Sequence, residues 1–147
     1  MSITAPNYAL EQSIVSYLNS QTTNTGSLLS GSNATFYTGI GNFDLASVPA
    51  VIVDASNFTE YAPNTRNYTF TVNIYVKEMA ADTTNLGVLS FGVFNEFVNN
   101  NTAKVNFTDP SYNISVFNVR ETSMHPTFTG DALVNEITTT IEGALTP

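Results

Sequence analysis

Residues 66–79 constrain the fold more than any other part of the chain, because apolar and polar side chains alternate along them. A period of two is that of a β-strand, whose successive side chains point to opposite faces of a sheet. One face would carry Tyr68, Phe70, Val72, Ile74 and Val76, and the other Thr69, Thr71, Asn73, Tyr75 and Lys77. The alternation predicts a long strand with one buried face, and therefore a sheet that needs a covering layer on that face.

Two segments have the helical period that a covering layer requires. Residues 6–21 begin with a proline at a first-turn position and carry apolar residues at helical spacing, with Ser and Gln opposite. Residues 82–99 show a second helical pattern, which we expect to end in the run of asparagines at 99–101. Gly87 and Gly92 each cost about 1 kcal/mol in a helix interior, so we expect them where this helix lies close on the sheet.

Four further segments have the composition of strands, namely residues 34–38, 48–55, 112–124 and 133–145, with Pro49 at an edge or entry position. The order is then helix, three strands, helix, two strands (α-β-β-β-α-β-β). We expect an α+β fold with a mostly antiparallel sheet of four to five strands and two helices packed on one face. The opposite face would be rich in Thr, Asn and Tyr.

The composition sets limits on domain number and on partners. A chain of 147 residues forms one domain by default, here spanning residues 1–147, and 42% hydrophobic residues without cysteine allow a core without disulfides. The formal net charge of −8 would repel phosphate backbones and anionic lipids. No apolar run approaches the length of a membrane span. Nucleic acid and membranes are therefore not expected to be bound.

Residue types that carry catalysis are sparse. The chain has one histidine, His125, and no cysteine, so neither a thiol nucleophile nor a histidine-rich metal site can be built. The acidic residues are scattered and lack the spacing of a calcium loop, and Gly39-Ile40-Gly41-Asn42 lacks the rest of a dinucleotide-binding motif. We expect neither an enzyme nor a protein with a metal or cofactor.

The order of elements resembles that of the tail terminator and tail completion proteins, also called head–tail joining proteins, of tailed bacteriophages. The resemblance covers nearly the whole chain. It rests on Pro49 opening a buried strand, on the link 57–67 before the long alternating strand, and on a final strand entered through a polar loop at 128–131.

The resemblance implies a structural virion protein without catalytic residues, which forms a homo-oligomeric ring, commonly a hexamer. Such a ring caps the tail tube, contacts the tail tube protein and the head connector, and lets DNA pass through its lumen without specific binding. It implies a location at the head–tail junction of the virion, after assembly in the host cytoplasm.

Two other functions stay open. The first is a tail tube or minor capsid subunit, whose small domains share the abundance of Thr and Asn. The second is a secreted or surface carbohydrate-binding domain that uses Tyr8, Tyr37, Tyr61 and Tyr112 to hold sugars. The first residues of the chain lack the pattern of an export signal, which argues against the second.

Candidate interface residues are apolar or basic groups in polar surroundings. The connector 21–33, which we expect to be flexible, contains Leu28 and Leu29, and the expected loop 57–67 contains Phe58 and Tyr61. Exposed apolar groups of this kind are typical of interface residues, although they could instead fold back onto their own core. Arg66 and Arg120 could pair with acidic residues of a neighbouring subunit.

Overall fold

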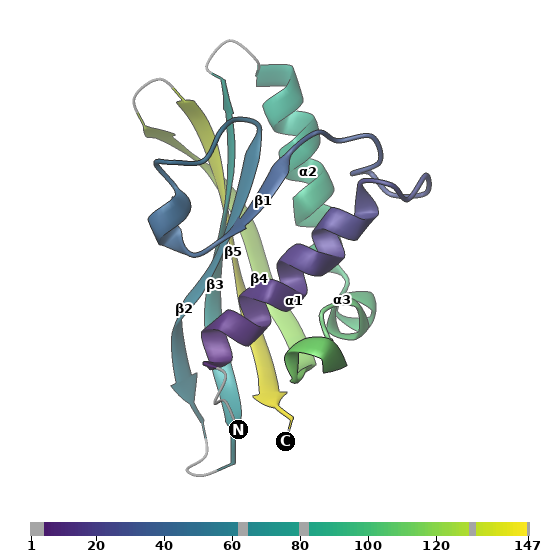
Figure 1. Ribbon diagram of the computed structural model, residues 1–147, viewed down its shortest axis with the longest axis vertical. Helices are drawn as coiled ribbons and strands as arrows, with labels where there is room; N and C mark the ends of the chain where they lie inside the picture. The colour runs from purple at the N-terminus through teal and green to yellow at the C-terminus, as the bar shows by residue number, and fades with distance from the viewer. Residues whose placement is uncertain (1–4, 62–64, 80–82, 130–131, 147) are drawn as a thin grey trace.

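The computed structural model describes residues 5–61, 65–79, 83–129 and 132–146. It contains three helices, five strands and two short 3-10 turns within that part of the chain (Figure 1). In chain order these are α1 (Pro6–Gln21), β1 (Thr35–Thr38), η1 (Ile40–Asn42), β2 (Ala50–Glu60), β3 (Asn67–Met79), α2 (Thr83–Val98), α3 (Asn100–Asn106), η2 (Pro110–Tyr112), β4 (Ile114–Thr129) and β5 (Ala132–Leu145).

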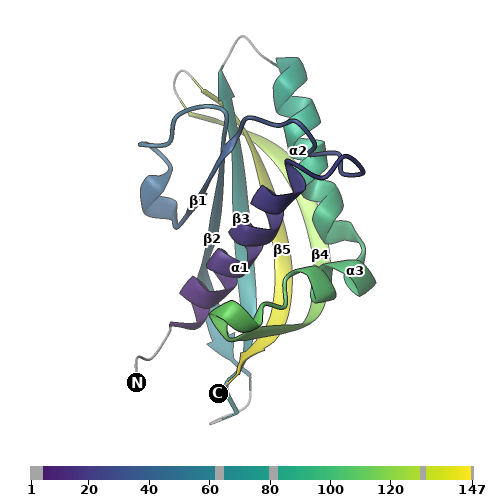
Figure 2. The same cartoon turned by 45° about the vertical axis from the view of Figure 1, so that its right-hand side comes forward.

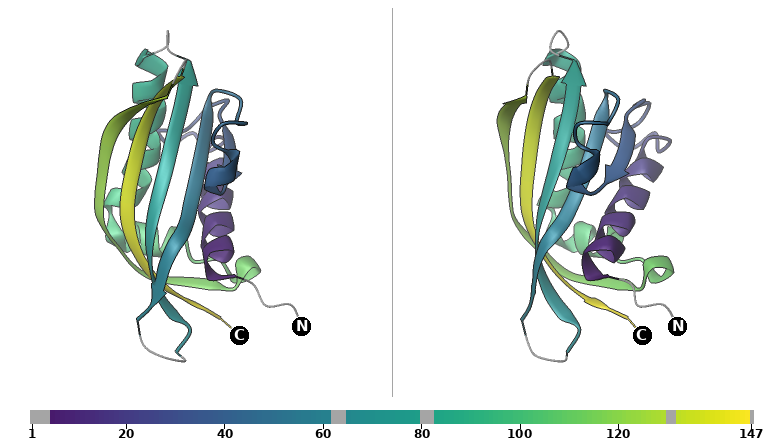
Figure 3. Two further views of the ribbon diagram at one scale, coloured as in Figure 1. Left: turned by 90° about the vertical axis from the view of Figure 1, so that its left-hand side faces the viewer. Right: turned by 60° about the vertical axis from the view of Figure 1, so that its left-hand side comes forward.

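The strands form one sheet in the order β1-β2-β3-β5-β4. Only β1 and β2 are parallel, and all other neighbours are antiparallel. The helices cover one face of this sheet (Figures 1 and 3). The predicted α+β class and the mostly antiparallel sheet are thus confirmed. The predicted order is incomplete, because the layer holds three helices and not two.

The alternation along β3 is confirmed. Phe70, Val72, Ile74 and Val76 are fully buried, whereas the side chains between them are half-buried on the other face. β3 has this central role because β2 and β5 pair with it over most of its length. The face away from the helices carries Thr, Asn and Tyr along β3, as expected, and is called the open face below.

The core lies between the sheet and the helices. α1 contributes Leu10, Ile14 and Leu18, all fully buried. The rings of Phe97 from α2 and Phe107, just after α3, stack with centroids 4.8 Å apart. Burial of one such side chain stabilises the fold by roughly 1.5–3 kcal/mol. This contact joins the end of α2 to the end of α3.

The second helix ends at the run of asparagines, as expected, but a third helix follows it. α2 ends at Val98, but Asn99 caps a further helix, α3, by accepting hydrogen bonds on its side chain from the backbone N–H groups of Asn101 and Thr102. Asparagine favours both helix ends and helix starts, and here it starts one. Figure 2 shows α2 and α3 one after the other beside β4, the strand at one edge of the sheet.

The expected loop 57–67 is also partly wrong, because β2 continues to Glu60 and pairs with β3 as far as Tyr68. The ring of Phe58 lies 5.7 Å from those of Tyr68 and Phe70, so this residue packs against the core. The expected polar loop 128–131 is partly strand, since Phe128 and Thr129 belong to β4. Residues 62–64 and 130–131 lie outside the described residues.

Candidate assembly surfaces

Helix α2 is apolar on two sides. Leu89, Val93 and Phe97 face the sheet and are buried. On the outward side, the side chains of Val88, Phe91 and Val98 are 60%, 53% and 50% exposed. These three residues recur at helical spacing on one face and are called the α2 stripe. The exposed Asn95 lies between Phe91 and Val98 on this side, and the three apolar side chains of the stripe are surface beyond what the core needs.

The connector 22–33 lies against this helix. It is a series of hydrogen-bonded turns, closed where the Gly31 N–H donates to the Thr22 carbonyl at 2.8 Å. Leu29 is buried in the core, while Leu28 is 53% exposed. A Cβ on Gly92 of α2 would lie 2.8 Å from Leu29 Cδ2, so the absence of a side chain at Gly92 lets the connector approach.

The expected role of the two glycines in α2 is therefore wrong. Gly92 makes room for the connector and not for the sheet. A Cβ on Gly87 would meet nothing within 4 Å. Between the connector and the first turns of α2 lies a hollow of about 170 Å³, lined by Leu28, Leu29, Ser30, Gly31, Ser32, Asn33, Asn85, Val88 and Leu89.

On the open face, residues 39–49 form a raised segment over the start of β2 (Figure 3). Phe43 packs edge-to-face on Tyr75, with ring centroids 5.3 Å apart. Lys77 Nζ donates to the Phe43 carbonyl at 2.8 Å and lies 5.2 Å from the centre of its ring. Beyond this fixed base, the Leu45 side chain is 84% exposed.

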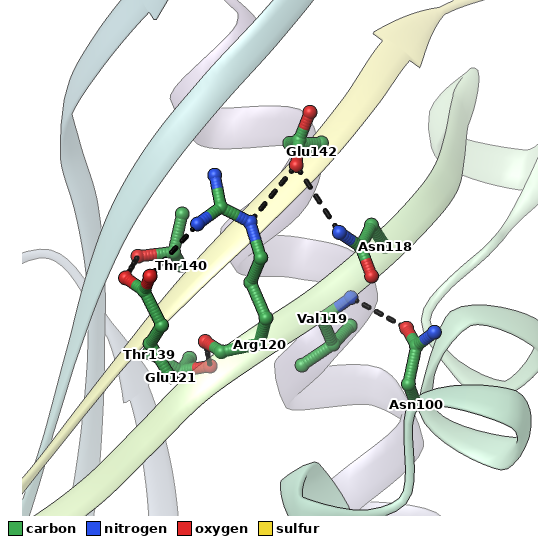
Figure 4. A network of polar contacts seen from close by, with 8 residues as sticks. All are labelled: Asn100, Asn118, Val119, Arg120, Glu121, Thr139, Thr140 and Glu142. Atoms are coloured by element: carbon green, nitrogen blue, oxygen red, sulfur yellow. Dashed lines mark hydrogen bonds and ion pairs between the residues drawn. The ribbon is translucent and has the colours of Figure 1, made fainter.

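Side chains bond backbone N–H groups of the edge strand β4. Asn100 Oδ1 accepts from the Val119 N–H at 2.7 Å (Figure 4), and Thr108 Oγ1 accepts from the Val116 N–H at 2.8 Å. Further along, Glu121 has a left-handed backbone at a bulge, and Pro126 has no N–H. Capped donors, bulges and prolines hinder the addition of a further strand. The surface of β4 is therefore poorly suited to edge pairing.

Arg120 is engaged within its own chain (Figure 4). Its guanidinium donates to Glu142 at 3.0 Å and to Glu121 at 2.9 Å. A hydrogen bond from Asn118 and the contact with Arg120 lower the pKa of Glu142. The network orients polar side chains of β4 and β5 on the open face, so any contact of Arg120 with a neighbouring subunit would be shared with these carboxylates.

The six candidate interface residues fall in separate places. Leu28 borders the hollow beside α2, whereas Leu29 is buried in the core and Phe58 packs against it, which is the alternative in which these side chains fold back onto their own chain. Tyr61 and Arg66 lie at the end of the β2–β3 hairpin, where the Tyr61 side chain is exposed and Arg66 has φ 63°. Their place in an interface stays a prediction.

Sequence reasoning missed the α2 stripe and Leu45. The stripe had a signal, because apolar residues in 82–99 exceed what one buried face needs. Leu45 stands in a segment that the sequence predicts only as a loop, in which one leucine has no distinguishing pattern.

Two other observations bear on the expected chemistry. His125 Nε2 lies 2.9 Å from Glu136 Oε1 on the open face, and burial together with Glu136 raises the pKa of Tyr75 to about 12. In the described residues, no three His, Asp or Glu side chains gather as a metal site would require. None of the described helices is long and apolar enough to cross a membrane.

Comparison with protein families and with curated proteins finds no match for this chain. The resemblance to tail terminators therefore stays a prediction based on the order of elements.

Proposed function

We propose that this protein is a structural, non-catalytic subunit that assembles with copies of itself into a ring, and that the ring is a phage tail terminator. The α2 stripe is the observation that carries the proposal. Interface centres are poor in charge and enriched in aromatic residues, as is the stripe with Phe91 at its middle. Since the core is complete without these side chains, their exposure suits a contact with another protein surface.

The proposed partners follow from the position of such a ring. It would sit on the tail tube protein, present its other side to the head connector, and reside at the head–tail junction of the virion. The net charge of −8 agrees with passage of DNA through a lumen that does not bind phosphate groups. We propose no membrane partner, metal or cofactor.

A tail tube or minor capsid subunit is the alternative that shares these features, because its subunits also contact one another. The carbohydrate-binding function has less support. Tyr37 pairs with Ile52 near the start of β2, and Tyr61 follows the end of that strand. Tyr37 and Tyr112 also pack against apolar clusters. Tyr37 and Tyr61 therefore lie at opposite ends of β2, so the four tyrosines do not all share one platform for a sugar ring.

Sedimentation velocity, native mass spectrometry and negative-stain images of the purified protein test the proposal. We expect closed rings with a mass that is a whole multiple of 15.9 kDa. Rings added to tail tubes should cap one end of each tube. Open polymers of stacked rings would favour the tube subunit instead. A monomer at all concentrations tested would overturn the proposal.

A further inference from the structure

We infer that neutral polar side chains close both edges of the sheet and prevent further strands from being added to it. These edge-blocking residues are Ser32 and Asn42 at β1, and Asn100 and Thr108 at β4. The inference goes beyond the proposed function, because it concerns the single chain before any assembly. It also limits the kind of contact that another protein can make, since the faces and loops of the fold stay available and the outer strands do not.

The outer strand of an open sheet presents a row of backbone N–H and C=O groups on which another strand can form. The outer strands here are β1 and β4. Natural proteins often protect such strands with lysine, but this chain has two lysines, Lys77 and Lys104, and neither lies on an outer strand. It has 18 asparagines and 21 threonines instead. Neutral polar side chains are therefore the groups available to protect the edges.

The first half of β4 is closed by two side chains from the segment that precedes it. Thr108 Oγ1 accepts from the Val116 N–H at 2.8 Å, and the hydroxyl donates to the Lys104 carbonyl of α3 at 2.7 Å. Asn100 Oδ1 accepts from the Val119 N–H at 2.7 Å (Figure 4). A strand added here would have to break both bonds to β4 and displace α3, which lies beside β4 in Figure 2.

The segment that carries these two side chains is itself anchored in the core. Phe107, which directly follows α3, is fully buried, and its ring lies 5.5 Å from that of Tyr17 in α1. The Tyr17 hydroxyl also accepts from Asn106 Nδ2 at 3.0 Å. Because the segment is held from behind, Asn100 and Thr108 cannot move away from β4 without a loss of core packing.

The second half of β4 is closed by its backbone. The pairing with β5 shifts register between Arg120 and Ser123, and Glu121 within this bulge has φ 59°. The left-handed region is unfavourable for a residue with a side chain, so the bulge is kept in spite of a conformational cost. Further along, Pro126 has no N–H to donate to an added strand. The two halves of β4 are therefore closed by different means.

β1 is closed at both ends. The Gly39 N–H, directly after the strand, donates toward β2 at 2.8 Å, so by alternation the backbone of Thr38 faces outward. The Thr38 carbonyl accepts from Asn42 Nδ2 at 2.6 Å. At the other end, the N–H of Ala34 donates to Ser32 Oγ at 3.2 Å. A strand of four residues that is bonded in this way offers little edge for pairing.

Amide hydrogen exchange tests whether the bonds to β4 form in solution. An N–H on the outer side of an edge strand exchanges fast when it faces water. Asn100→Leu and Thr108→Val keep the approximate size of each side chain but remove the acceptor, so the amide of Val119 or Val116 should exchange roughly tenfold faster. Thr108→Ser keeps the hydroxyl and should leave Val116 protected. Unchanged exchange in the first two variants would overturn the inference.

The oligomeric state tests the consequence of these bonds. Asn100→Leu combined with Thr108→Val should form open polymers that bind thioflavin T, at a protein concentration at which the natural chain binds none. Within the polymers, the amides of Val116 and Val119 should be protected again, because they then donate to the added strand. Fast exchange in the double variant without polymers would overturn the inference, since the bonds would then have no part in closing the edge.

The matched control is Asn101→Leu with Thr102→Val, which makes the same chemical changes in α3. Within the part of the chain that the structure describes, neither side chain bonds β4, so this variant should not polymerise. Polymers from the control as well would overturn the inference, because the loss of polar groups alone would then explain them. Circular dichroism verifies folding, and Thr108→Val alone replaces the double variant if that one does not fold. Failure of the natural chain to form rings would overturn the proposed function only.

Discussion

Helices α1 and α2 cover the same face of the sheet, yet their outward sides differ. α1 buries Leu10, Ile14 and Leu18 and exposes Ser16, Asn19 and Ser20, and its one large exposed apolar side chain is Tyr8 in the first turn, at 51%. α2 buries a comparable set but exposes the α2 stripe. Beyond its first turn, the outer side of α1 is polar, whereas that of α2 carries three exposed apolar side chains. The difference teaches that core formation explains one apolar side of a helix, and that a second apolar side calls for another explanation.

The buried sides of the two helices differ as well. α1 carries two buried polar groups that fix its place: Glu11 Oε2 accepts from the Ala55 N–H at 2.8 Å, and Ser13 Oγ donates to the Phe107 carbonyl. In α2 the buried polar group is Ser90, whose hydroxyl accepts from Asn135 Nδ2 at 2.9 Å. α2 has two further hydrogen bonds, since Asn85 Nδ2 donates to Glu78 and the Phe97 carbonyl accepts from Thr122 Oγ1 at 3.4 Å. The hydrogen bonds of α1 therefore go to β2 and to the residue after α3, whereas those of α2 go to β3, β4 and β5.

The largest difference in stability is expected between substitutions on the buried and on the exposed side of α2. Phe97→Ala should lower the free energy of unfolding by about 3–5 kcal/mol, because it leaves a cavity beside Phe107. Phe91→Ala should change it by less than about 0.5 kcal/mol, because Phe91 has no core role. Urea unfolding of both variants, at a protein concentration low enough to keep the chain monomeric, measures the two values. Equal losses would contradict the division of α2 into a core side and a surface side.

The two glycines of α2 should respond with opposite sign. Gly92→Ala gains helix propensity but forces a Cβ against buried Leu29, at a cost of about 1–3 kcal/mol. Gly87→Ala meets nothing within 4 Å and should stabilise the helix by up to about 1 kcal/mol. The same unfolding measurement applies. Stabilisation by both substitutions would mean that the connector 22–33 does not pack on Gly92 in solution.

An effect of about the same size is expected at the polar contacts of α1. Ser13→Ala should lower the free energy of unfolding by about 1–3 kcal/mol, because it leaves the Phe107 carbonyl without its donor. Ser16→Ala, on the exposed side of the same helix, is the matched control and should change stability by less than about 0.5 kcal/mol. If both serines had the same small effect, the hydrogen bond of Ser13 would not help to position α1.

The main elements could be predicted because they have a strong period. β3 alternates over its whole length, and α1 has one apolar face, so their buried residues follow from spacing alone. The extension of β2 to Glu60 could not be predicted in this way. Residues 57–60 have a loop-like composition and become strand only because Phe58 meets Tyr68 and Phe70 across the hairpin.

The candidate surfaces were harder to predict for a related reason. Leu28 and Leu29 are neighbours in one polar connector, and only the space left by Gly92 decides that Leu29 is buried and Leu28 is not. In α2, residues on the inward and outward sides are both apolar, so periodicity alone cannot separate core from surface. The parallel pairing of β1 likewise depends on tertiary contacts and not on its four residues.

The smallest expected effect is the pH dependence that Glu11 of α1 gives to the free energy of unfolding. Burial raises the pKa of this carboxyl, the hydrogen bond from Ala55 opposes the rise, and the charge of Asp54 adds to it. A raised pKa in the folded state means that Glu11 favours folding below its unfolded pKa, and that this contribution is lost as the pH rises through the folded value. Glutamine keeps an acceptor for Ala55 but does not ionise.

The free energy of unfolding of Glu11→Gln, minus that of the natural chain, should therefore increase between pH 4 and pH 8. Glu142→Gln provides a contrast of opposite sign, since the hydrogen bond from Asn118 and the contact with Arg120 lower the pKa of Glu142. Its contribution is present above the unfolded pKa and lost as the pH falls, so the same difference should decrease as the pH rises. Chemical denaturation at each pH measures both slopes. Parallel slopes would show that Glu11 is not held in a buried contact, and α1 would then be positioned without a contribution from this carboxylate.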